Sequence, residues 1–148
     1  MFMGQYSHSL DEKGRLIIPS RFREELGREF VVAKGYDECL YAYNNEEWEK
    51  FAESVMELPE TRKVNRDKRR YFLSTASQVE MDRQGRALIP GYLRDAVGID
   101  KDIVITGVGN KLEIWSRSKW DEVTGSDAMA KIAAELYDSG DDDSADER

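Results

Sequence analysis

The sequence is poor in the side chains that most catalytic and metal centres require. Its 148 residues include one cysteine and one histidine. The single cysteine, Cys39, excludes a disulfide within the chain, and its apolar neighbours predict buried packing rather than reactivity. His8 alternates with polar residues as in a half-buried strand, which favours a packed or surface histidine over a general base or ligand. No group of His, Cys, Asp and Glu has zinc or calcium spacing. We therefore expect no metal, no cofactor, no small-molecule substrate and no enzymatic activity.

Long apolar runs are absent as well. The longest are a few residues, too short to cross a bilayer. The first residues, MFMGQYSHS, lack the charged and apolar regions of a secretory signal. With 40% apolar residues, a chain of this length can still bury a core. We expect one domain, or two small repeats that share a core, in a cytoplasmic protein without a membrane partner.

Negative charge dominates, but it is unevenly distributed. The formal net charge is −8, and residues 138–148 (DSGDDDSADER) contribute −5 of it, from six acids and one arginine. This segment predicts a disordered acidic tail. By contrast, RKVNRDKRR at 62–70 has six basic residues and one acid. The run is either a solvated face or a surface for a polyanion, and the sequence leaves both interpretations open.

The chain does contain an internal repeat. DEKGRLIIPSRFR at 11–23 and DRQGRALIPGYLR at 82–94 are identical at six of thirteen positions, where composition alone gives roughly one. In each copy an aspartate suits the first position of a type I turn, and a glycine supplies the positive φ that follows. A short strand then runs to a proline, and a short helix ends at a second glycine. The turn-forming residues are Asp11 and Gly14 in the first copy, and Asp82 and Gly85 in the second.

Two further strands and a helix that begins near a tryptophan complete each unit in the same order. We divide the chain into a first repeat at 5–48, a helical basic linker at 49–75, a second repeat at 76–120, a C-terminal helix at 121–137 and the acidic tail at 138–148. Each unit is too small to close a core alone. We expect the two to pair about a pseudo-two-fold axis into one β-barrel, which gives a mainly β fold with flanking helices (α+β).

The arginine after each turn glycine is the strongest candidate for a functional residue. Arg15 and Arg86 begin the outgoing strands, and the planar guanidinium suits phosphate oxygens or the O6 and N7 atoms of guanine. Lys13 and Arg83, inside the turns, would add contacts to a nucleic-acid backbone.

Alternative interpretations of these arginines remain open. Each could form an ion pair with the aspartate of its own turn and serve only to stabilise the hairpin. Arg23 and Arg94, which close the repeated motif, lie on the short helices and could equally be solvated. At the level of function, the alternatives to DNA binding are a non-DNA oligomeric assembly module, in which the arginines bridge subunits, and an enzyme that uses the abundant carboxylates.

The doubled D-x-x-G-R turn, the strand and proline that follow it, and the N-terminal MFMGQYSHSLDEKGRLIIPSRFR closely resemble the bacterial MraZ transcriptional regulators. These are relatives of the AbrB/SpoVT swapped-hairpin DNA-binding proteins, and the resemblance covers roughly residues 1–137. The family's Asp-x-x-x-Arg motif falls on Asp11/Arg15 and Asp82/Arg86, and the tail from Asp138 lies outside its pattern.

What this resemblance implies is specific. The fold would be a double-repeat AbrB/SpoVT-like swapped-hairpin β-barrel. The protein would be a cytoplasmic, nucleoid-associated regulator that binds short direct repeats of double-stranded DNA. Its target would be the division and cell-wall gene cluster, including its own promoter, which it would usually repress. The resemblance also implies a ring-shaped homo-oligomer.

Overall fold

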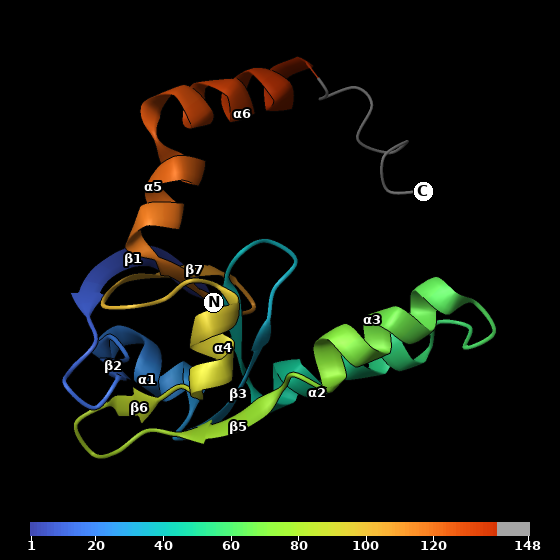
Figure 1. Cartoon of the computed structure of the whole chain (residues 1–148), viewed down its shortest axis with the longest axis horizontal. Coiled ribbons are helices and arrows are strands. Elements are labelled where there is room, and N and C mark those ends of the chain that lie inside the picture. The colour runs from blue at the N-terminus through green and yellow to red at the C-terminus, as the bar shows by residue number, and fades with distance from the viewer. Residues whose placement is uncertain (139–148) are drawn as a thin grey trace. The chain divides into compact units, whose positions relative to one another are not determined.

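A computed structural model describes residues 1–138 of the chain (Figure 1). Residues 1–117 form one compact unit, and a second unit begins at Ser118. The predicted acidic tail, 138–148, lies outside the described residues except for Asp138. The elements, in chain order, are β1 (Phe2–Ser9), β2 (Arg15–Ile17), α1 (Ser20–Leu26), β3 (Glu29–Lys34), β4 (Leu40–Asn44), α2 (Asn45–Met56), α3 (Lys63–Leu73), β5 (Ser77–Glu80), β6 (Arg86–Leu88), α4 (Gly91–Ala96), β7 (Asp102–Gly109), β8 (Leu112–Ser116), α5 (Arg117–Thr124) and α6 (Ser126–Asp138).

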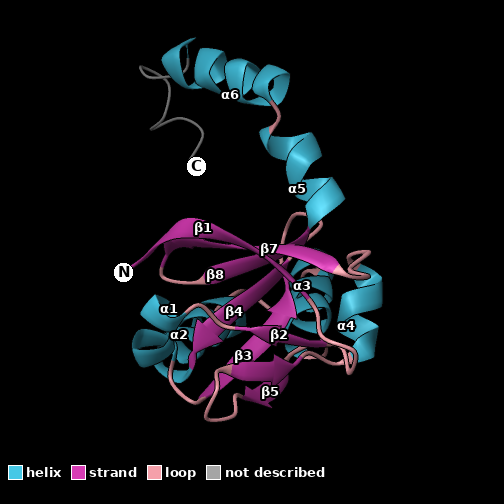
Figure 2. Ribbon diagram, turned by 90° about the vertical axis from the view of Figure 1, so that its left-hand side faces the viewer, coloured by secondary structure: helices cyan, strands magenta, loops and turns pink. Residues whose placement is uncertain are grey.

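Strands of the two repeats are interleaved in a six-stranded antiparallel sheet of order β1-β7-β8-β4-β3-β5 (Figure 2). Strand β1 of the first repeat pairs with β7 of the second, and its counterpart β5 pairs with β3 of the first. At the centre β4 pairs with its own counterpart β8, with Tyr41 opposite Glu113. If each strand is replaced by its counterpart in the other repeat, the same strand order is obtained, read from the opposite edge of the sheet. The sheet therefore has the pseudo-two-fold, swapped arrangement that the duplicated sequence predicts.

The two strands that follow the turns, β2 and β6, form a separate antiparallel ribbon. Leu16 lies opposite Ala87, the equivalent residue of the second repeat, and both side chains are buried. Ribbon, sheet and the short helices α1 and α4 contribute to one apolar core, whose members from the two repeats include Leu16, Phe22, Phe30, Ala87, Leu93 and Ile105. The repeats thus share one core, as their small size requires.

Helices α2 and α3 pack side by side (Figure 1), and the ring centroids of Phe51 and Phe72 are 5.1 Å apart. The Asn44 side chain caps α2 by accepting a hydrogen bond from the Glu47 N–H. The basic run at 62–70 lies mainly on α3.

The C-terminal helix predicted at 121–137 is divided into α5 and α6 at Gly125. Glycine in a helix interior is less stable than alanine by about 1 kcal/mol, which favours a break there. No side chain of α6 is buried, and Met129, Ile132 and Leu136 form an exposed apolar stripe along it. Within residues 1–138, no helix has the length and apolar character needed to span a membrane.

The predicted fold class is confirmed, since the chain is a mixed α+β protein with a mainly antiparallel sheet and flanking helices. The strands do not close into a continuous barrel, because β1 and β5 stay at the two edges of the six-stranded sheet. Strand β1 also begins earlier than the predicted first repeat, at Phe2, because that side chain is buried against the ring of Phe22.

Candidate nucleic-acid interface

Each Asp-x-x-Gly-Arg segment forms a tight turn that its aspartate closes. In the first turn, the Gly14 N–H donates to the Asp11 carbonyl at 2.9 Å. The Asp11 carboxylate accepts hydrogen bonds from the N–H groups of Lys13 and Arg15, both at 2.9 Å. Gly14 has a φ of 79°, a left-handed backbone conformation that residues with a Cβ rarely adopt. The second turn has the same hydrogen bonds, made by Asp82, Gln84, Gly85 and Arg86.

These hydrogen bonds also keep the two aspartates charged. The Arg15 N–H is the main cause that lowers the pKa of Asp11 below its ordinary value of 3.8, and the Arg15 guanidinium and the Lys13 N–H add to it. Arg86 lowers the pKa of Asp82 in the same way. At neutral pH each turn therefore contains a carboxylate that is engaged by its own backbone.

Arg15 and Arg86 are each held by one edge of the guanidinium only. In both turns the arginine Nε donates to the aspartate Oδ2 at 2.7 Å. Within residues 1–138, no acceptor is hydrogen-bonded to Nη1 or Nη2 of either arginine. The two interpretations that the sequence left open are thus compatible: the aspartate fixes the arginine, and the outer edge of the guanidinium stays available to a ligand.

The β2–β6 ribbon places both arginines on one outward face. Arg15 lies opposite Leu88, and Arg86 lies opposite Ile17. Because opposed residues share a face and successive residues alternate, all four lie on the side away from the buried centre of the ribbon. Strand geometry separates the two arginine Cα atoms by about 8 Å. The side chains of Arg15 and Arg86 are 26% and 34% exposed, so they are accessible to a partner while most of their surface stays packed against the protein.

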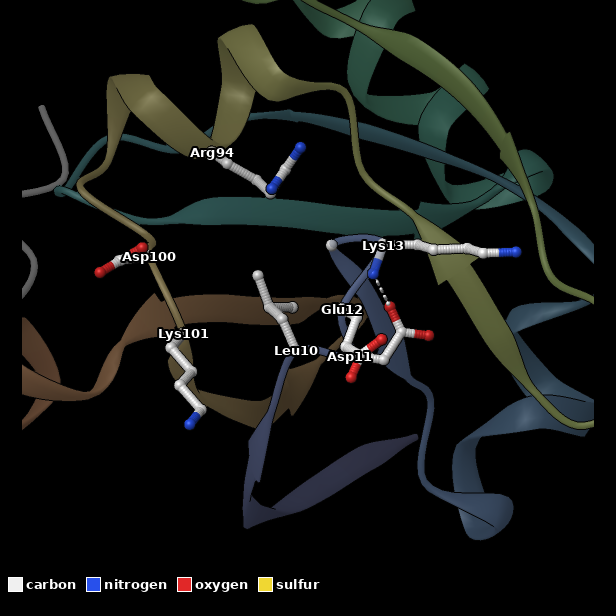
Figure 3. A pocket seen from close by; sticks show the side chains of 8 residues that line it. Leu10, Asp11, Glu12, Lys13, Arg94, Asp100 and Lys101 are labelled. Atoms are coloured by element: carbon white, nitrogen blue, oxygen red, sulfur yellow. Dashed lines mark hydrogen bonds between the residues drawn. The ribbon is translucent and has the colours of Figure 1, made fainter.

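Lys13 and Arg83 are exposed at the tips of the turns. Beside the first turn lies a cavity of about 500 Å³ (Figure 3). Three acidic and three basic side chains contribute to its lining, namely Asp11, Glu12, Asp100, Lys13, Arg94 and Lys101. Because these charges balance, the cavity is not selective for a small anion, and the exposed ribbon face is the better candidate for a functional surface.

Arg23 and Arg94, for which the sequence left a contact role and a solvated position equally open, also reach the turns, and each comes from the opposite repeat. The guanidinium of Arg94 covers Gly14, where an added Cβ would lie 2.7 Å from Nη1. The guanidinium of Arg23 covers Gly85 in the same manner. Sequence reasoning missed this placement. The available signal was the closing arginine, which is identical in the two copies of the motif.

The basic run on α3 is largely engaged within the helix pair. Arg66 and Arg69 donate to backbone carbonyls between the end of α2 and the start of α3. Lys63 and Arg70 form salt bridges with Asp67 on the same helix. These contacts favour a structural role for the run over a surface for a polyanion.

The sequence matches the model of the family described as "MraZ protein, putative antitoxin-like" twice, at residues 1–71 and 72–138. The chain belongs to the MraZ family. The resemblance inferred from the doubled turn is thereby confirmed, and each match covers one of the interleaved repeats with the helices that follow it.

Relatives named "Transcriptional regulator MraZ" align over nearly the whole chain. That of Lachnoclostridium phytofermentans is 49% identical over 140 residues, which cover 95% of this chain and 98% of the relative. That of Moorella thermoacetica is 48% identical over 140 residues, with 93% and 98% covered. That of Syntrophomonas wolfei is 45% identical over 142 residues, with 95% and 99% covered. The family membership agrees with the prediction that the chain is not an enzyme.

Proposed function

We propose that this MraZ-family chain is a sequence-specific DNA-binding regulator of transcription, which meets double-stranded DNA with the outer face of the β2–β6 ribbon and its two turns. The observation that carries the proposal is the symmetric pair Arg15 and Arg86, each fixed through Nε and free at its outer edge. The name of the relatives, transcriptional regulator, supports the regulatory role.

A two-stranded ribbon suits the major groove, which is about 12 Å wide and admits such an element. A guanidinium with a free Nη edge can donate two parallel hydrogen bonds to phosphate oxygens or to O6 and N7 of guanine. Lys13 and Arg83 at the tips would contact phosphates, and such contacts position the ribbon without reading sequence. Because the chain has a net charge of −8, a single copy would bind a polyanion weakly.

Several copies in a homo-oligomer, ring-shaped as the family resemblance implies, would overcome this weakness. The exposed stripe of Met129, Ile132 and Leu136 on α6 supports association with a second copy. Ribbons that meet successive direct repeats would raise avidity by roughly 10²–10⁴. In the cell, such an oligomer would be nucleoid-associated and would repress the division and cell-wall gene cluster, its own promoter included.

Binding of the purified full chain to the DNA upstream of its own gene tests the proposal. A gel shift should require less wild-type protein for DNA with the direct repeats than for scrambled DNA. The Arg15→Ala/Arg86→Ala variant should lose this preference, whereas Arg62→Ala, which removes an exposed arginine before α3, should keep it. Equal binding of scrambled DNA by the wild type would contradict the proposal. A folded oligomer that binds no DNA would favour the alternative of a non-DNA assembly module.

A further inference from the structure

We propose that Arg23 and Arg94 are positioning residues, each of which holds the DNA-contacting turn of the opposite repeat in its binding geometry. The proposal rests on the proposed function of the turns. The contacts that carry it are within the protein, so they can be tested with and without DNA.

The first contact joins α4 to the turn at Gly14. Arg94 is anchored at Nε, which donates to the Ile89 carbonyl at 3.0 Å. Its guanidinium then extends from α4 toward the turn that carries Lys13 (Figure 3). A Cβ on Gly14 would lie 2.7, 3.1 and 3.3 Å from Nη1, Cζ and Nη2, and these are its three nearest atoms. The guanidinium therefore occupies the space that a side chain on Gly14 would need.

The second contact repeats the first with the roles of the repeats exchanged. The Nε of Arg23 donates to the Ile18 carbonyl at 2.8 Å, and its guanidinium lies where a Cβ of Gly85 would be. Gly85 is buried beneath it. The Ile18 N–H, directly after β2, also donates to the Gly85 carbonyl at 2.8 Å, which ties the same turn to the first repeat.

The contacts cross from one repeat to the other because β2 pairs with β6. In sequence, the arginine that closes the same copy of the motif as Gly14 is Arg23, nine residues away, yet Arg94, eighty residues away, covers it. Anchoring each turn to the helix of the other repeat fixes the two turns relative to one another. A surface that is already ordered loses less conformational entropy when it binds, which increases affinity. Lysine cannot replace the arginine, because it lacks both the Nε–H and the flat guanidinium face.

Hydrogen exchange of the DNA-free protein tests directly whether each arginine holds the turn of the opposite repeat. Arg94→Ala should speed exchange in peptides covering 10–16 more than in those covering 81–87, and Arg23→Ala should do the reverse. Each variant is the matched control of the other. The conservative variant Arg94→Lys should behave like Arg94→Ala. If each arginine instead affects the turn of its own repeat, or neither turn responds, the proposal is wrong.

Thermal melting of paired variants gives a second measurement. Gly14→Ala should lower the melting temperature less in the Arg94→Ala background than in the wild type, because the contact between Cβ and the guanidinium is gone. In the Arg23→Ala background, Gly14→Ala should lower it by the wild-type amount. Equal losses in both backgrounds would overturn the assigned pairing.

DNA binding separates positioning from direct contact. Arg94→Ala should weaken specific binding roughly threefold to tenfold. In a Lys13→Ala/Arg15→Ala background it should cause no further loss, because it acts through that turn, whereas Arg23→Ala should still weaken binding. If the losses from Arg94→Ala and the turn variants add in full, Arg94 contacts DNA itself and the positioning role fails. If the wild type binds no DNA, the proposed function fails, and the exchange experiment still decides whether the turns are held across the repeats.

Discussion

Replacing Arg15 by alanine should separate DNA binding from folding. The substitution removes a guanidinium whose Nη edge is free, and it leaves the hydrogen bonds from the backbone N–H groups of Lys13 and Arg15 to Asp11 in place. The turn should keep its shape, so the melting temperature should change by less than about 3 °C. A bidentate arginine contact contributes about 1–3 kcal/mol, so Kd should rise roughly 5- to 150-fold for each ribbon that is engaged.

The salt dependence of the same variant identifies what Arg15 contacts. If it neutralises a phosphate, the slope of log K against log salt should become shallower by about 0.9. If it reads guanine, the slope should be unchanged and discrimination at one base pair should be lost. Fluorescence anisotropy over a salt series measures both, with circular dichroism to follow folding and Arg62→Ala as the control. An unchanged Kd, or a large loss of stability in Arg15→Ala, would refute the assigned role.

Gly14→Val should destabilise the chain by at least about 1 kcal/mol, seen as a lower melting temperature, because a β-branched residue resists a φ of 79°. The lowered pKa values of Asp11 and Asp82 mean that their hydrogen bonds stabilise the folded chain above pH 3.8 and are lost as the pH falls through the lower folded values. A carboxyl NMR titration should accordingly show both groups below 3.8, and Asp11→Asn should remove one of them. Ile132→Asp on the exposed stripe of α6 should reduce the oligomer mass measured by light scattering, and an unchanged mass would place the subunit contact elsewhere. Inserting about 5 bp between direct repeats should cost most of the avidity, because it turns one site to the far side of the helix.

The turns and the shared core could be predicted from sequence because their causes are local or periodic. Gly14 and Gly85 have the positive φ that a glycine at the end of an Asp-initiated turn predicts. The duplicated strands predict that neither repeat closes a core alone, and the interleaved sheet confirms a shared one.

The remaining features depend on tertiary pairing, which short stretches do not reveal. The sequence places Arg94 on a helix of the second repeat, but only the pairing of β2 with β6 brings it over Gly14. The open edges at β1 and β5 likewise depend on how far each strand pairs. A salt bridge between Arg15 and Asp11 was one of the two interpretations that the sequence allowed. That it uses only the Nε of the guanidinium, and not the two Nη atoms, was visible only in the structure.

Hydrogen exchange of the wild-type chain, with and without DNA that carries direct repeats, tests the proposed interface most directly, because it reports where on the protein the DNA lies. We expect slower exchange on DNA binding in peptides that cover the turns and ribbon, residues 10–17 and 81–88, and no change at 62–70 on α3. Protection confined to α3, or absent from both turns while DNA is bound, would contradict the assignment of the ribbon as the DNA-binding surface.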